Sequence, residues 1–292
     1  MFRATAAVRP AARPGPGDAA AGVPRLVRAG RYAPDGPGTP YVPAADREEF
    51  FRQLGAPHGV PFDRAGFAAA PRRTSVELVR GALAELGPLS AEEAPEVVVV
   101  AYAAPDFEHA ELIASCAQGL LPGEPLAFGL SDQGVLAPFS ALRAAVEYAR
   151  RCGLRRLLVL AVDQSSQPFA VPADHPGAVL ADVAVALLFE WRDAAAPVHG
   201  MGQLPWPGPG PAVPWDRELP LVAGAGVRTA VSGVWPWATW APAGQPATAV
   251  WSALADLAGG GPARAVVADH DAERAMLAHC TLDLACRTST GE

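Results

Sequence analysis

The chain has 292 residues but contains no lysine and no asparagine, and all 23 of its basic residues are arginines. Without lysine the protein cannot form a Schiff base, anchor pyridoxal phosphate or complete a phosphate-binding Walker loop. Isoleucine is nearly absent, whereas alanine, arginine, glycine and proline are abundant. This bias is typical of GC-rich coding sequences, such as those of actinobacteria.

Long apolar runs and an excess of basic charge are also missing. Half of the residues are apolar, yet no uncharged apolar stretch approaches the roughly 20 residues that span a bilayer. We therefore predict no membrane-spanning segment. The formal net charge of −7 disfavours nucleic acid as a partner, because the phosphate backbone attracts basic surfaces.

Cysteine is scarce, and no two of the four cysteines form a CxxC pair, which argues against a metal site. The glycine-rich residues 223–227 are too short for a dinucleotide fingerprint, so we expect no cofactor. Residues 1–24 are rich in proline and alanine and lack the apolar core of an export signal. We interpret them as a disordered leader and expect a cytoplasmic protein with reduced thiols.

Strand and helix patterns alternate along the rest of the chain. Short apolar runs predict buried strands, and apolar residues at helical spacing predict helices. The predicted strands are residues 25–34, 96–102, 126–130, 155–163, 181–191, 264–271 and 276–286. The predicted helices are residues 45–55, 74–87, 109–120, 138–152 and 247–260. This alternation indicates an α/β fold with a parallel or mixed sheet covered by helices.

Residues 194–248 differ from the rest of the chain because proline, glycine and tryptophan dominate them. We interpret the proline-rich part as a linker. Five tryptophans lie between Trp206 and Trp240. They could form a ligand platform, but we favour the interpretation that they pack a loop onto the core.

The order of the elements resembles the thiolase fold, and specifically the ketoacyl-ACP synthase III-like branch, over about residues 26–191 and 244–286. Residues 74–87 resemble the first long helix of that family, and Tyr102–Asp106 resembles its T-x-x-P-D turn. Residues 109–163 resemble the run from its third helix through the nucleophile turn into the dimer-edge strand. HPGAVLADVAVALLFE stands where the family has a GDGAGA strand, and GQPATAVWSALADL resembles its GNT-x-A-S helix start.

The resemblance implies two pseudo-repeated mixed-sheet βαβ halves, residues 25–193 and a shortened half at 194–292. It also implies dimerisation through residues 155–163 and an acyl substrate carried by CoA or acyl carrier protein. Enzymes of this family attack the thioester with a cysteine at a helix N-terminus and use a histidine and an asparagine. Here the cysteine position falls at Gly134 or Val135, and Gln245 replaces the asparagine. Because the segment from Gly200 to Asp269 contains no histidine, decarboxylative condensation is not expected.

The same turn suggests what this chain does instead. Gln133 parallels the glutamine that replaces the cysteine in chain-length-factor subunits of polyketide synthases. The resemblance therefore implies a partner subunit, in a heterodimer with an intact ketosynthase or in a homodimer. We expect Gln133, Gly134, Val135 and Gln245 to contact the acyl group, with the backbone N–H groups of the helix start binding a carbonyl oxygen.

An enzymatic role is the alternative. His175, oriented by Asp174 or Asp182, or else Asp132 or Gln133, would then catalyse acyl transfer, cyclisation or hydrolysis in the retained pocket. The run Asp269–Asp271 resembles an acid–base or metal cluster, but neighbours on a strand point apart, which disfavours a joint site.

Basic residues also cluster at the end of one predicted helix and the start of the next strand. Arg151, Arg155 and Arg156 could receive an acidic carrier protein or the phosphates of CoA. A helix C-terminus attracts cations for structural reasons too, and the sequence does not separate the two interpretations.

Overall fold

The computed structural model describes residues 22–104, 106–108, 112–192, 198–209, 213–233, 235–258 and 262–284. Residues 1–21, most of the predicted leader, and Cys286 lie outside the described residues. None of the described helices is both long and apolar enough to cross a bilayer.

The first half of the chain builds five strands of a mixed sheet. They are β1 (Arg25–Tyr32), β2 (Val97–Tyr102), β3 (Leu126–Leu130), β4 (Arg156–Asp163) and β5 (Val183–Glu190). Their order across the sheet is β3-β2-β4-β5-β1. The first three strands in this order run parallel, β5 is antiparallel to β4, and β1 is antiparallel to β5.

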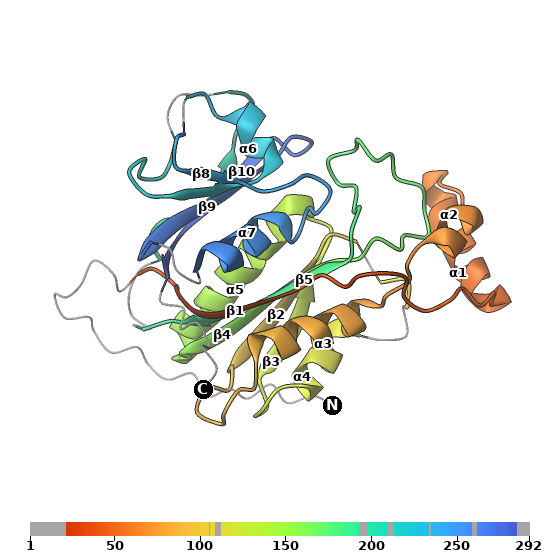
Figure 1. Ribbon diagram of the computed structural model, residues 1–292, viewed down its shortest axis with the longest axis horizontal. Coiled ribbons are helices and arrows are strands. Elements are labelled where there is room, and N and C mark those ends of the chain that lie inside the picture. Colours follow the sequence, from red (N-terminus) through yellow and green to blue (C-terminus); the bar gives the residue numbers. More distant parts are fainter. Residues whose placement is uncertain are drawn as a thin grey trace.

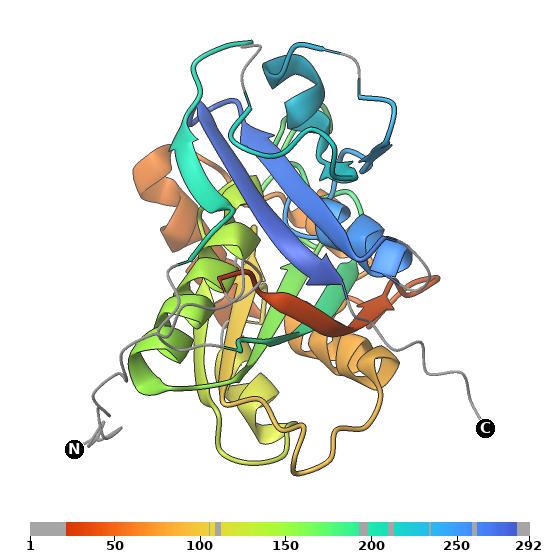
Figure 2. The same ribbon diagram turned by 90° about the vertical axis from the view of Figure 1, so that its left-hand side faces the viewer.

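The second half repeats this arrangement. Its strands are β6 (Met201–Pro205), β7 (Leu221–Ala223), β8 (Ala238–Trp240), β9 (Arg264–Asp271) and β10 (Met276–Leu284). Their order is β8-β7-β9-β10-β6. As in the first half, the first three strands in this order run parallel, and the last two pairs, β9–β10 and β10–β6, are antiparallel. The first strand, β1, also pairs briefly with the last, β10, and joins the halves into one sheet (Figure 2).

Helices cover both faces of this doubled sheet (Figure 1). The helices α5 (Ala137–Cys152) and α7 (Ala249–Ala258) lie between the two halves, where Phe139 and Trp251 pack with ring centroids 5.0 Å apart. The outer face of the first half carries α3 (Ser75–Leu86) and α4 (Ile113–Gly119), and that of the second half carries α6 (Ala225–Ala230). This layering confirms the predicted thiolase-like fold.

Local sequence explains why α3 begins and ends where it does. The Thr74 hydroxyl accepts a hydrogen bond from the Glu77 N–H, while the Glu77 carboxylate accepts one from the Thr74 N–H. This capping box satisfies two donors at the helix start. Gly87 follows the helix with a φ of +84°, a conformation that glycine adopts without strain. The predicted helix over residues 74–87 is therefore confirmed.

Two short helices and a 3-10 turn extend from the first half. They are α1 (Ala45–Gly55), η1 (Ala56–His58) and α2 (Arg64–Ala69). Phe51, Phe67 and Phe107 form a separate small core beneath them. The apolar pattern predicted α1 but not α2, which is only six residues long.

The second half differs from the first in what covers its outer face. Among residues 206–209 and 213–220, which connect β6 to β7, the structure has no helix equivalent to α3. Tryptophan rings from this connection and from residues 235–240 pack against β7, β9 and β10 instead. These rings belong to Trp206, Trp215, Trp235 and Trp240, whereas Trp237 is 74% exposed. This agrees with the packing interpretation of the tryptophans.

The proline-rich stretch interpreted as a linker falls between β6 and β7, and residues 194–248 also hold β6, β7, α6 and β8, which the sequence did not predict. One sequence-based prediction needs correction. Residues 155–163 do not supply a free edge, because β4 is hydrogen-bonded to β2 on one side and to β5 on the other. Continuous apolar sequence marks burial on both faces and does not distinguish an edge strand from a central one. In the described sheet, β3 and β8 are the ends of the strand order, and β6 is a further edge because it pairs only with β10.

Candidate functional site

A cavity of about 320 Å³ lies where the starts of α5, α6 and α7 meet the end of β9. Its walls come from the 3-10 turn η2 (Gly134–Leu136), the loop 173–176, the segment 242–246 and the start of α6. The side chains with polar groups among its lining residues are Asp174, His175, Thr229, Gln245, Asp269 and His270. The cavity thus collects segments from both halves of the chain.

Asp163, at the end of β4, holds one wall of this cavity in place. Its buried carboxylate accepts hydrogen bonds from the N–H groups of Ala247 and Thr248 and from the Thr248 hydroxyl, at 2.7–3.1 Å. These bonds fix the segment that leads from Gln245 into α7. Burial raises the pKa of Asp163 to about 6, although the hydrogen bonds from Thr248 and Ala247 act to lower it.

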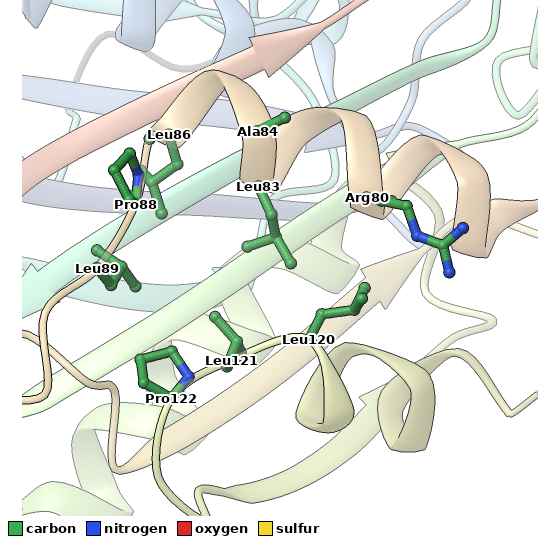
Figure 3. Close-up of a pocket in the computed structure, with 10 residues that line it drawn as sticks. Arg80, Leu83, Ala84, Leu86, Pro88, Leu89, Leu120, Leu121 and Pro122 are labelled. Carbon is green, nitrogen blue, oxygen red and sulfur yellow. The ribbon is translucent and has the colours of Figure 1, made fainter.

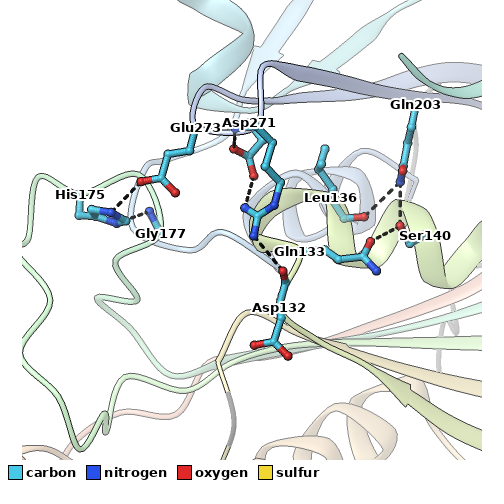
Figure 4. Close-up of polar contacts among 10 residues, drawn as sticks. Asp132, Gln133, Leu136, Ser140, His175, Gly177, Gln203, Asp271 and Glu273 are labelled. Atoms are coloured by element: carbon cyan, nitrogen blue, oxygen red, sulfur yellow. Dashed lines mark hydrogen bonds and ion pairs between the residues drawn. The ribbon is translucent and has the colours of Figure 1, made fainter. Parts of the chain in front are cut away.

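Asp271, at the end of β9, takes the equivalent position in the second half. Its carboxylate accepts hydrogen bonds from the backbone N–H and the guanidinium of Arg274, the latter at 2.8 Å. The same guanidinium donates to the carbonyl of Asp132 at 2.8 Å (Figure 4). A Cβ at Gly134 would lie 3.2 Å from Asp271 Oδ2, and Gly134 has a φ of +51°. The end of each central strand therefore supports a helix start of the other half.

Three of the residues singled out from the sequence meet in this cavity. Val135 lines it from η2, Gln245 from the segment before α7, and His175 from the loop after β4. The amide of Gln245 makes no hydrogen bond to any other described residue. It is therefore free to bind a ligand. Gly134 lies next to Val135 but is not part of the lining.

His175 is held in a way that does not suit a general base. Its Nδ1 accepts a hydrogen bond from the Gly177 N–H at 3.0 Å, so this nitrogen carries no proton. Its Nε2 lies 2.8 Å from the carboxylate of Glu273, to which it donates (Figure 4). Both ring nitrogens are therefore engaged. The orienting carboxylate is that of Glu273 and not that of Asp174 or Asp182, which had been expected.

Asp132 and Gln133 do not line the cavity. Gln133 Oε1 accepts a hydrogen bond from the Ser140 hydroxyl, whose oxygen accepts one from Gln203 Nε2 at 2.9 Å (Figure 4). This chain of contacts ties β6 to α5. The carboxylate of Asp132 is exposed and accepts the Ser131 hydroxyl hydrogen at 2.6 Å. Neither residue therefore shares the cavity lining with Val135 and Gln245.

Asp269 is the titratable residue of the cavity that the sequence did not single out on its own. It is 5% exposed, and its Oδ1 accepts a hydrogen bond from the His270 N–H at 2.8 Å. Burial, together with the nearby Asp271, raises its pKa to about 7 against the effect of that hydrogen bond. The sequence feature that could have identified Asp269 is its position at the end of a predicted buried strand, because strand C-termini collect functional groups in α/β folds.

Two glycines at the start of α6 leave room for the Asp269 carboxyl group between β9 and α6. A Cβ at Gly224 would overlap the Asp269 carboxyl group, and one at Gly226 would overlap the carbonyl oxygen of His270. The absence of side chains at these two positions lets the end of β9 approach α6. The Nε2 atom of His270 lies 3.1 Å from the Trp206 carbonyl oxygen, to which it donates, whereas its Nδ1 is buried without a partner among the described residues.

A second cavity, of about 330 Å³, lies on the outer surface between α3 and α4 (Figure 3). Leucine and proline side chains line it, among them Leu83, Leu89 and Leu121. Among the described residues that line it, Arg80 is the only titratable one. These described lining residues therefore offer apolar contact but no acid, thiol or hydroxyl group for catalysis.

The arginines proposed to bind a carrier lie far from the first cavity. Arg155 and Arg156 line a hollow of about 430 Å³ together with Arg192, at the start of β4. The nearby Arg151 forms only a 4.0 Å ion pair with Glu147. Because β4 has eight residues, this hollow is roughly 23 Å from Asp163 at the other end of the strand. The structure does not bring these arginines together with Val135 and Gln245.

No protein-family model and no curated protein sequence matches this chain. Solved structures do match it over nearly the full length of both chains. The β-ketoacyl-[acyl carrier protein] synthase III of Thermus thermophilus superposes with a TM-score of 0.58 at 12% identity, covering 89% of this chain and 98% of that one.

Two further structures give the same picture. The 3-oxoacyl-(acyl carrier protein) synthase III of Pseudomonas aeruginosa PAO1 matches with a TM-score of 0.54 at 15% identity, covering 89% of this chain and 98% of that one. ChlB3, described as an acyltransferase, matches with a TM-score of 0.55 at 14% identity, covering 89% and 97%. At such identities the likeness establishes the fold, which is that of ketoacyl-ACP synthase III.

Proposed function

We propose that this protein, which has the fold of ketoacyl-ACP synthase III, binds an acyl thioester of CoA or acyl carrier protein without forming a covalent bond to it. It would do so as the partner of an active ketosynthase in a pathway of the polyketide or fatty-acid type. The observation that supports the proposal is the cavity beside η2. Its lining from that turn is Val135, an alkyl side chain that cannot attack a thioester.

The other potential nucleophiles of the described chain support the same conclusion. The Thr229 hydroxyl in the cavity donates to the Gly226 carbonyl. Cys152 lies at the far end of α5, about 22 Å from Ala137 for a helix of 16 residues. Cys280 is fully buried on β10, and burial raises the pKa of its thiol far above the ordinary value. Cys116 lies on α4, and none of the three thiols lines the cavity.

The rest of the cavity suits an acyl group and its carbonyl. Its volume falls within the range typical of small-ligand sites, which are mostly apolar with a few polar groups that fix the orientation. Alanine and proline side chains supply the apolar surface. The Gln245 amide stands where the resemblance places an asparagine, and its N–H groups can donate to a thioester carbonyl.

An unpaired strand edge supports the association with a second chain. β3, with the sequence LAFGL, pairs only with β2 in the described sheet, and Leu126 is 45% exposed. An apolar edge strand with free N–H and C=O groups is prone to pair with another strand. We therefore assign the dimer contact to β3, in a homodimer or with a ketosynthase.

Mass spectrometry of the intact protein tests the absence of a covalent step. After incubation with octanoyl-CoA, the wild-type protein should carry no acyl adduct under denaturing conditions, and it should bind a non-hydrolysable octanoyl-CoA analogue in equilibrium dialysis. Val135→Cys should gain an adduct of one octanoyl group, whereas the control Tyr148→Cys, on the exposed surface of α5, should not. An adduct on wild-type residues 131–137, or no binding by dialysis, would overturn the proposal.

A further inference from the structure

We propose that Asp269 is a catalytic base that activates water against the carbonyl of the bound thioester, so that the protein is a thioester hydrolase. This inference rests on the proposed function, because it requires the thioester to occupy the cavity between η2 and α7. It adds a reaction to that binding and needs no nucleophilic side chain.

The first argument is the position of Asp269. Its carboxyl group lies at the end of β9, in the cavity lining and shielded from bulk solvent. The carboxyl group occupies the position that a side chain at Gly224 would need. Gln245 lines the same cavity, with an amide that no other described residue binds. The site therefore combines a proton acceptor with a donor for the carbonyl oxygen.

The second argument is that no cationic side chain among the described residues neutralises the Asp269 carboxylate. No arginine or histidine forms an ion pair with it within the described residues, and its one hydrogen bond comes from the His270 backbone. A buried carboxylate without a cation is costly, and such carboxylates are found at catalytic sites more often than in ordinary cores.

The charged groups around the cavity, apart from the exposed Asp174, are already committed to other contacts. On β9 and the turn that follows, Asp271 is paired with Arg274. From the loop 173–176, His175 is paired with Glu273, and Asp174 is exposed. His270 donates to Trp206, and α6 and η2 contribute no charged side chain to the lining. The proton affinity of Asp269 is thus set by burial and by Asp271, which place its pKa at about 7.

The reaction balances without a covalent intermediate. Asp269 removes a proton from a water molecule as the water oxygen bonds to the carbonyl carbon, and the Gln245 amide donates to the developing oxyanion. When the tetrahedral intermediate collapses, the C–S bond breaks. The proton passes from Asp269 to the departing thiolate, which yields a carboxylic acid and a free thiol.

Hydrolysis of octanoyl-CoA by the purified full-length protein tests this step through release of the CoA thiol. We expect a rate above the uncatalysed reaction that rises with pH and levels off above about pH 7, because the ionised form of Asp269 acts as the base. Asp269→Asn, which keeps the shape of the side chain, should lower kcat by about 100-fold or more. Asp256→Asn, the same change at an exposed site on α7, should leave it unchanged.

A non-hydrolysable octanoyl-CoA analogue, with a methylene group between sulfur and carbonyl, separates this inference from the proposed function. Wild type and Asp269→Asn should bind it with similar affinity. Binding without hydrolysis, or equal rates for wild type and Asp269→Asn, would overturn the role of Asp269 and leave the binding proposal intact. Failure of the wild type to bind the analogue would overturn both.

Labelled water, together with the absence of an acyl adduct in denaturing mass spectrometry, distinguishes a base from a nucleophile, because water could open an acyl–Asp269 anhydride at either of its two carbonyl carbons. In a single turnover in H₂¹⁸O, a base leaves the label in the released octanoic acid and none in the protein. Label in the peptide that contains Asp269 would mean that the carboxylate itself attacked the thioester, and this would overturn the general-base step.

Discussion

The bond between Asp163 and the start of α7 gives the sharpest prediction about stability. In Asp163→Ala, the N–H groups of Ala247 and Thr248 and the Thr248 hydroxyl lose their acceptor. Ala247 and Thr248 are fully buried, so water cannot replace the carboxylate without a rearrangement. Each buried donor without a partner costs about 2 kcal/mol, which gives about 6 kcal/mol for the three.

Part of this loss is offset by removal of a buried charge. Burial raises the pKa of Asp163 from 3.8 to about 6, which corresponds to about 3 kcal/mol of destabilisation when the group is ionised. We therefore expect Asp163→Ala to lower the free energy of unfolding by about 3 kcal/mol at pH 7.

The pH dependence follows from the same pKa. Because the folded-state pKa is raised, the stability that Asp163 contributes is fully present below pH 3.8 and declines as the pH rises to about 6. Asp163→Ala should thus destabilise the protein more at pH 4.5 than at pH 7. Asp163→Asn keeps one acceptor and carries no charge, so we expect a smaller loss than that of the alanine variant at either pH.

Urea unfolding at both pH values, followed by circular dichroism, measures these differences. Asp256→Ala, on the helix α7 whose start Asp163 holds, is the matched control, because the Asp256 side chain is exposed. An unchanged unfolding midpoint for Asp163→Ala at pH 7, or a destabilisation that grows as the pH rises, would refute the reasoning.

Two further predictions concern the cap of α3 and the edge of the sheet. Thr74→Ala removes the hydroxyl that accepts from Glu77 and should lower the free energy of unfolding by about 1 kcal/mol, as urea unfolding would show. Thr74→Ser, which keeps the hydroxyl, should be nearly neutral. Leu126→Arg places a charge on the free edge of β3 and should convert dimers to monomers in analytical ultracentrifugation without changing the melting temperature by more than about 3 °C. Dimers that persist in this variant would exclude β3 as the contact.

The sequence predicted the elements whose burial leaves a local pattern. The central strands β2 and β4 agree with the prediction to within one residue, because strands buried on both faces are continuously apolar. The short strands β7 and β8 were missed, because three residues each, among prolines and tryptophans, show no period. The position of β4 inside the sheet was also beyond reach, since strand order depends on contacts between distant segments.

The site was predicted only in part for a similar reason. Val135 and Gln245, which line the candidate cavity, were proposed through the resemblance, because a shared fold indicates which distant positions meet in space. Asp269 was obscured by its neighbours His270 and Asp271, because adjacent residues on a strand point apart. Its burial depends on Gly224, a residue of a different element, and no local pattern records that contact.

The pairing of β1 with β10 has a consequence for synthesis on the ribosome. The inner faces of both half-sheets, with α5 and α7 between them, share one core. β9 and β10 complete this core and lie at residues 264–284, after all the other described strands. A nascent chain that has emerged only as far as β5 can pack α5 on β2 and β4, but the side of α5 that carries Phe139 still lacks Trp251 of α7 as its partner. Such a chain is a substrate for chaperones until its last strands emerge and dock beside its first.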